Sequence, residues 1–177
     1  MRTVEVFSNL WCNEVKKDGE TMFQNNLAVI SAHFSDHVTR FSEDRTFLEI
    51  VNPFGGENIK IEYVPEDERT PYILYFSFQH WHMNDEEDII EHIQDIIDGK
   101  LLSIEFFKCG KRCFGGDIEA QDLQNLSYKA LNNNFSGLRM NIIDIVDSFK
   151  VRGWKTDANF DAVFEVDGRG EIAIKIL

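Results

Sequence analysis

Apolar and polar residues follow patterns along the chain that predict both strands and helices. Val4, Val6 and Phe7 predict a short first strand at residues 4–7. Across residues 23–41, apolar side chains recur every three or four positions, which is the spacing of one face of an α-helix. Three segments rich in β-branched and aromatic residues then predict strands at residues 46–51, 59–64 and 72–78.

The strongest helix signal in the chain follows Asn84, which we predict to be the N-cap residue. Acidic residues fill the first turn, where the helix dipole favours negative charge. Gly99 stands where a glycine commonly ends a helix. The apolar stripe between these ends consists of Ile89, Ile90, Ile93, Ile96 and Ile97.

The remaining third of the chain predicts mainly strands. Residues 101–108 are rich in large apolar side chains, which is typical of a buried strand. A glycine-rich loop and a weaker helix at residues 118–132 follow this segment. From residue 138 onward, imperfect alternation predicts a long strand with a bend near residues 144–148. The last two apolar segments flank the sequence DGRG, which indicates a β-hairpin.

These elements predict an α+β domain with a single mixed, mainly antiparallel sheet, two or three covering helices and a C-terminal β-hairpin. The chain has 177 residues, contains no internal repeat and shows no shift in composition. We therefore expect residues 1–177 to form one domain, because a chain of this length can bury a sufficient core without further support.

The net charge of −13 narrows the range of partners. Nucleic acids and anionic membranes attract lysine and arginine, so an acidic chain is a poor candidate for either, whereas a basic protein partner is compatible. Cysteine occurs three times, an odd number that favours reduced thiols over disulfides. No secretory leader or membrane-spanning segment is recognisable, and we expect a soluble, cytoplasmic protein.

Two histidines and two cysteines could form a metal site. His80 and His82 follow the strand at residues 72–78, and Cys109 and Cys113 follow the strand at residues 101–108. If a helical crossover made these strands parallel, their carboxyl ends would share one edge of the sheet. Imidazoles and thiolates are ligands for tetrahedral zinc, and a thiol beside an imidazole could act as a nucleophile. The alternative is surface histidines and unreactive thiols.

An acidic segment beside a tryptophan is the candidate binding surface: Trp81, Asp85, Glu86, Glu87 and Glu91. An exposed tryptophan in such a position is typical of a binding hot spot, although Trp81 could equally cover the edge of the sheet.

No catalytic motif occurs, and we predict no cofactor and a non-enzymatic protein-binding module. An acidic character of this kind is similar to that of immunity or inhibitor proteins that neutralise a basic partner. The alternative prediction is a zinc- or thiol-dependent enzyme, or a structural zinc site, built from His80, His82, Cys109 and Cys113.

Overall fold

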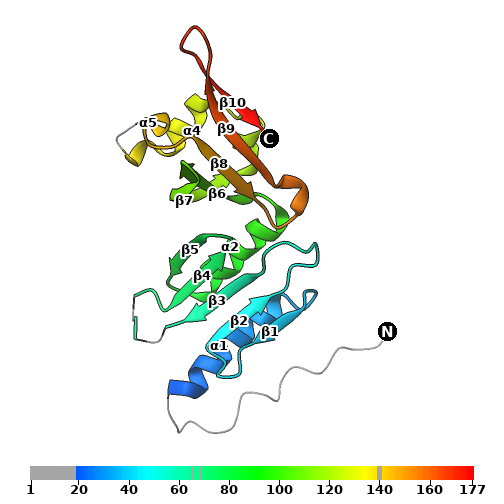
Figure 1. Ribbon diagram of the computed structural model, residues 1–177. Helices are drawn as coiled ribbons and strands as arrows, with labels where there is room; N and C mark the ends of the chain where they lie inside the picture. Colours follow the sequence, from blue (N-terminus) through cyan, green and yellow to red (C-terminus); the bar gives the residue numbers. More distant parts are fainter. Residues whose placement is uncertain (1–18, 65, 68, 139–140) are drawn as a thin grey trace.

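The first half of the chain forms an antiparallel sheet in which neighbouring strands are also consecutive in sequence (Figure 1). The computed structural model describes residues 19–64, 66–67, 69–138 and 141–177, so the strand predicted at residues 4–7 lies outside the described residues. The strands of this first sheet, in spatial order, are β1 (Thr39–Phe41), β2 (Phe47–Ile50), β3 (Ile59–Tyr63), β4 (Tyr72–Phe76) and β5 (Gln79–Met83).

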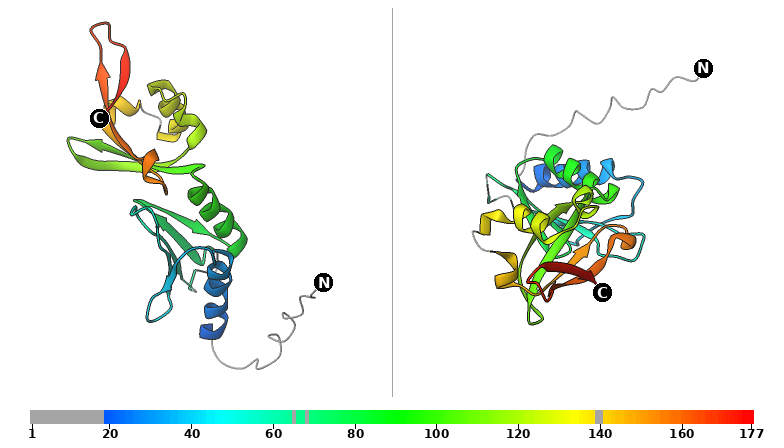
Figure 2. Two further views of the ribbon diagram at one scale, coloured as in Figure 1. Left: turned by 90° about the vertical axis from the view of Figure 1, so that its right-hand side faces the viewer. Right: turned by 90° about the horizontal axis from the view of Figure 1, so that it is seen from above.

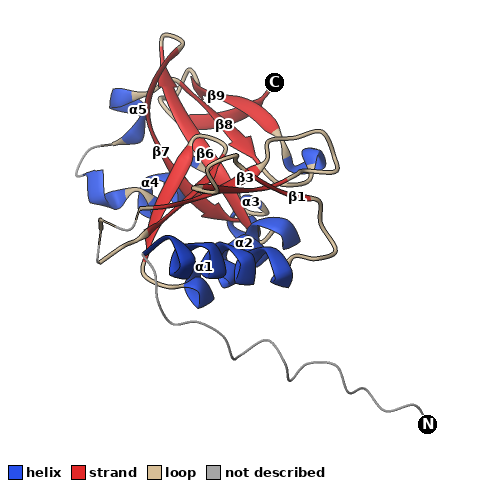
Figure 3. Cartoon of the chain, turned by 90° about the horizontal axis from the view of Figure 1, so that it is seen from below, coloured by secondary structure: helices blue, strands red, loops and turns tan. Residues whose placement is uncertain are grey.

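Two helices, α1 (Gly19–His33) and α2 (Glu86–Asp98), lie side by side over one face of the first sheet (Figure 3). The alternation within each strand explains this arrangement, because every second side chain is apolar and points toward the helices. Leu48 and Ile50 of β2 are fully buried on this side, together with Ile89 and Ile93 of α2. No helix of the described residues covers the opposite face of the sheet (Figure 2).

The second half of the chain forms another five-stranded antiparallel sheet. Its spatial order begins at one edge with β10 (Ile172–Ile176) and continues through β9 (Phe160–Val166), β8 (Ser148–Arg152), β6 (Leu101–Lys108) and β7 (Lys111–Glu119). Three short helices pack against it: α3 (Ala120–Leu123), α4 (Tyr128–Asn134) and α5 (Ile142–Ile145). Two single 3₁₀ turns complete the elements: η1 (Ser136–Leu138) and η2 (Thr156–Ala158).

Each sheet has its own hydrophobic core, and a few contacts join the two halves. Trp154 follows β8 in the sequence but is buried in the core of the first sheet. Its backbone carbonyl accepts a hydrogen bond of 2.8 Å from Nδ2 of Asn52. Nε2 of Gln79 in β5 donates to the carbonyl of Ile104 in β6 at 3.2 Å, so the halves meet near these residues.

The α+β class and the C-terminal hairpin of β9 and β10 are confirmed. The prediction of a single mixed sheet is wrong, because the strands divide between two sheets and all pairings of the described strands are antiparallel.

Three local predictions also differ from the structure. The helix expected to continue to residue 41 ends at His33, and Thr39–Phe41 forms strand β1. The strand expected after residue 138 is preceded by helix α5, in which Ile142 is buried, and Val146, the C-cap residue that follows the helix, is buried as well. The predicted glycine-rich loop is mostly strand β7, since Cys109 and Gly110 form a two-residue turn with φ angles of 50° and 74°.

Candidate functional site

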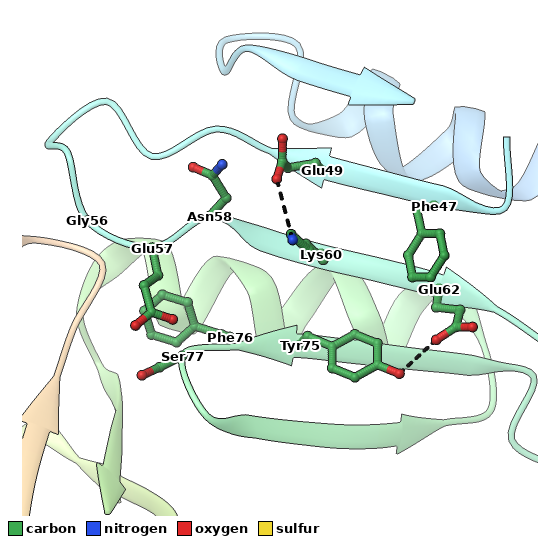
Figure 4. A pocket seen from close by; sticks show the side chains of 10 residues that line it. All are labelled: Phe47, Glu49, Gly56, Glu57, Asn58, Lys60, Glu62, Tyr75, Phe76 and Ser77. Atoms are coloured by element: carbon green, nitrogen blue, oxygen red, sulfur yellow. Dashed lines mark hydrogen bonds and ion pairs between the residues drawn. The ribbon is translucent and has the colours of Figure 1, made fainter. Parts of the chain in front are cut away.

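The open face of the first sheet is hollowed into a cavity of about 620 Å³ (Figure 4). We call this cavity the acidic groove. Its lining consists of Phe47, Glu49, Gly56, Glu57, Asn58, Lys60, Glu62, Tyr75, Phe76 and Ser77. Five of these ten residues, Phe47, Glu49, Lys60, Glu62 and Tyr75, occupy alternate positions of β2, β3 and β4, opposite to the apolar residues that face α1 and α2.

The strand register places the groove residues in cross-strand rows. Glu49 pairs directly with Lys60, and Lys60 with Tyr75 on the next strand. Phe47 pairs directly with Glu62 in the neighbouring row. Side chains at such positions are close enough to interact, so the groove combines aromatic and charged groups within one surface.

Carboxylates outnumber cations in the groove by three to one. Glu49 forms a long ion pair of 4.0 Å with Lys60, which leaves Glu57 and Glu62 without a lysine or arginine within 4.0 Å among the described residues. A groove with this balance of charge favours the approach of positively charged groups.

Tyr75 holds the carboxylate of Glu62 in place. The phenol hydroxyl of Tyr75 donates a hydrogen bond of 2.7 Å to Oε2 of Glu62 (Figure 4). Burial is the larger cause and this hydrogen bond to the carboxylate the smaller one, and together they raise the pKa of Tyr75 to about 12. The phenol therefore stays protonated near neutral pH and keeps donating to Glu62.

The other end of the groove contains Glu57 and Ser77 (Figure 4). Ser77 has a φ angle of 54° in the tight turn between β4 and β5, a conformation that non-glycine residues rarely adopt. Its hydroxyl is buried and has no hydrogen-bond partner among the described residues. This end of the groove therefore presents one carboxylate and one unsatisfied hydroxyl.

The four predicted metal ligands lie on two hairpins that belong to different sheets. His80 and His82 are exposed on β5, with ring centroids 5.4 Å apart. Cys109 lies in the turn between β6 and β7 and Cys113 lies on β7, and both thiols are free and exposed. Across the described ranges, no group of three or more histidine, cysteine or acidic residues is arranged to hold a metal ion.

The expectation of a parallel crossover was wrong. β4 turns directly into β5 through a hairpin, and β6 lies in the second sheet, so no shared edge brings the histidines and cysteines together. The segment Gln79–Met83 is a strand whose inward residues alternate with His80 and His82. This alternation was visible in the sequence, but the turn before it lacks the glycine or asparagine of a typical hairpin signal.

The predicted binding residues have several different structural roles. Trp81 is partly buried against the core of the first sheet, 4.6 Å between ring centroids from His92 of α2. The carboxylate of Asp85 accepts a hydrogen bond from the backbone of Asp88, which makes Asp85 the N-cap of α2 in place of the predicted Asn84. Glu86 accepts a hydrogen bond from the hydroxyl of Tyr72.

The exposed part of α2 carries a second acidic surface, which we call the α2 stripe: Glu87, Asp88, Glu91, Asp95 and Asp98. Lys100 forms ion pairs of 2.9 Å with Asp95 and 3.1 Å with Asp98. The predicted residues Glu87 and Glu91 thus lie on a solvent-exposed helix surface, and α2 covers the face of the first sheet that is opposite to the groove.

Several groove residues were missed in the sequence, although the relevant signal was present. Phe47, Glu62 and Tyr75 alternate with buried residues in segments that were predicted to be strands. The alternation indicates that each points away from the core, but their meeting depends on the register of three strands.

Comparison of the chain with protein-family models, curated proteins and solved structures finds no match. Among the helices in the described part of the chain, none combines the length and apolar character required to cross a membrane.

Proposed function

We propose that the protein is a non-enzymatic binding module that recognises a basic protein partner through the acidic groove. The observation that carries the proposal is a concave sheet surface in which three carboxylates surround one lysine and two aromatic rings, those of Phe47 and Tyr75, lie beside them. Surfaces that combine aromatic anchors with unbalanced charge suit specific protein recognition.

The net charge of the whole chain also favours a basic protein partner. A net charge of −13 attracts cationic proteins from a distance and speeds their association. The groove adds a shaped surface to this general attraction, and specificity requires such a surface. A role as an inhibitor or immunity-like protein that covers a basic partner is the form of this function that we favour.

The test is to isolate the partner and then measure its affinity with purified components. The chain is used to capture proteins from lysate of its own source cells, and each captured protein is purified and titrated by calorimetry at about 50 and about 300 mM salt. We expect a basic partner whose affinity falls at the higher salt concentration, because screening weakens attraction between opposite charges.

Two matched variants locate the binding surface. The groove variant combines Glu49→Gln, Glu57→Gln and Glu62→Gln, and the stripe variant combines Glu87→Gln, Asp88→Asn and Glu91→Gln, so each removes three negative charges. We expect the groove variant to bind at least about tenfold more weakly and the stripe variant to change affinity only slightly. Equal binding by the groove variant and the parent, or a partner that is not basic, would contradict the proposal.

A further inference from the structure

One end of the acidic groove has the chemistry of a receptor for a single cationic side chain. Glu62 is partly buried, and the ring of Phe47 lies directly across from it on the adjacent strand. Tyr75 approaches the same carboxylate from the other side (Figure 4). The three side chains come from three neighbouring strands, so the sheet backbone fixes their spacing.

The carboxylate of Glu62 has unused capacity to accept hydrogen bonds. Its Oε2 atom accepts the hydroxyl of Tyr75, while Oε1 accepts no hydrogen bond from any described residue. The two nearby cations lie closer to Glu49 in the sheet: Lys60 forms the 4.0 Å ion pair with Glu49, and Arg40 is opposite Glu49 in the strand register. A partly buried charge without a counter-ion is costly, so a cation that arrives at Glu62 is favoured.

We infer that Glu62, Tyr75 and Phe47 bind the guanidinium group of an arginine side chain presented by the basic partner. The inference rests on the proposed function and names the group that the groove recognises. Arginine donates hydrogen bonds in a planar fork that matches a carboxylate, and its flat face stacks on aromatic rings. Its weaker hydration also makes entry into a partly buried site less unfavourable than it is for lysine.

Three synthetic peptides of nine residues provide the probe. They share a glycine and serine background with one lysine at each end and differ only at the central position, which is arginine, lysine or citrulline. Citrulline has the shape of arginine without its charge. Binding to the full chain is measured by fluorescence anisotropy up to about 1 mM chain, a range that covers the weak affinity of a single side-chain site.

We expect the arginine peptide to bind about tenfold more tightly than the citrulline peptide and several-fold more tightly than the lysine peptide. Glu62→Gln keeps the shape of the side chain and the acceptor for Tyr75 but removes the charge, so this preference disappears. Phe47→Ala should weaken binding of the arginine peptide more than binding of the lysine and citrulline peptides. The stripe variant serves as the control and keeps the preference, and circular dichroism establishes that each variant is folded.

Several results would overturn the inference. Equal affinity for the arginine and lysine peptides would show that the guanidinium group is not recognised. A preference for arginine that survives Glu62→Gln would show that Glu62 does not form the site. Absence of binding of the arginine peptide at about 1 mM chain would also contradict the proposed arginine site. In each of these cases the proposed function stands if the purified partner still binds the parent more tightly than the groove variant. Loss of that difference contradicts the proposed function itself.

Discussion

Tyr75 illustrates at the scale of one residue how a phenol can organise a charged surface. Its ring fills part of the groove, and its hydroxyl fixes one oxygen of Glu62. Burial disfavours the charged phenolate, and the hydrogen bond to the carboxylate requires the protonated phenol, so together they raise the pKa of Tyr75 to about 12. The position of the carboxylate therefore depends on the protonation of its neighbour.

This dependence predicts a loss of stability in alkaline solution. The pKa of Tyr75 is higher in the folded state than in the unfolded state, where it is near 10. Its contribution to the free energy of unfolding is therefore complete below about pH 10 and is lost as the pH rises through about 12. Urea unfolding of the parent and of Tyr75→Phe at several pH values measures this effect. The stability difference between the two proteins should shrink across that window, and a constant difference would contradict the assignment.

Helix α2 shows at the scale of an element how local signals and packing agree. Asp85 caps its N-terminus, and Ile89, Ile93 and Ile96 are buried along one side. At the other end, Gly99 adopts a φ of 76° and donates its backbone N–H to the carbonyl of Ile96. A left-handed residue at this position ends the helix and turns the chain toward β6.

Gly99→Ala should therefore destabilise the protein by about 1 kcal/mol, because alanine carries a Cβ that disfavours a positive φ. No atom lies within 4 Å of the position that this Cβ would occupy, so the cost is conformational and not a clash. Gly168→Ala is the matched control, since its surroundings are equally open and its φ is not positive. Thermal unfolding compares the two variants. Similar melting temperatures for both would show that the backbone conformation of Gly99 carries no special cost.

At the scale of the whole molecule, a buried charge lies where the two halves meet. The side chain of Glu105 on β6 is only 1% exposed, and Nε of Arg112 lies 2.6 Å from its Oε1. Neither oxygen of Glu105 has a hydrogen bond of good geometry with a described residue. Arg112 also donates from Nη2 to the carbonyl of Phe78, so it connects the second sheet with the turn after β4.

Burial raises the pKa of Glu105, although Arg112 opposes the shift. A raised folded-state pKa means that stability is complete below the unfolded pKa and falls as the pH rises through the folded value. Glu105→Gln stays neutral at every pH, so its stability relative to the parent should increase as the pH rises above about 4, the pKa range of a glutamate in the unfolded state. Chemical unfolding at intermediate pH values tests this, with the exposed Glu171→Gln as control. An equal pH profile for parent and Glu105→Gln would refute the prediction.

The sequence by itself determined the elements whose signals are local. The isoleucine spacing and terminal glycine predicted α2. Segments rich in β-branched, aromatic and other apolar residues predicted β2, β3, β4 and β6, and the sequence DGRG predicted the final hairpin, because these signals act within a few residues. The grouping of strands into two sheets could not be predicted in the same way, since pairing depends on contacts between distant segments.

The candidate site depended on the same distant contacts. His80 and Cys109 were expected together because a parallel crossover was assumed, but β5 and the turn between β6 and β7 belong to different antiparallel sheets. Phe47, Glu62 and Tyr75 were each recognisable as outward-facing positions, but only the antiparallel register of three strands made them neighbours. A shift of one residue in any strand would turn its outward side chains into the core, so tertiary packing, which selects the register, decided where the groove formed.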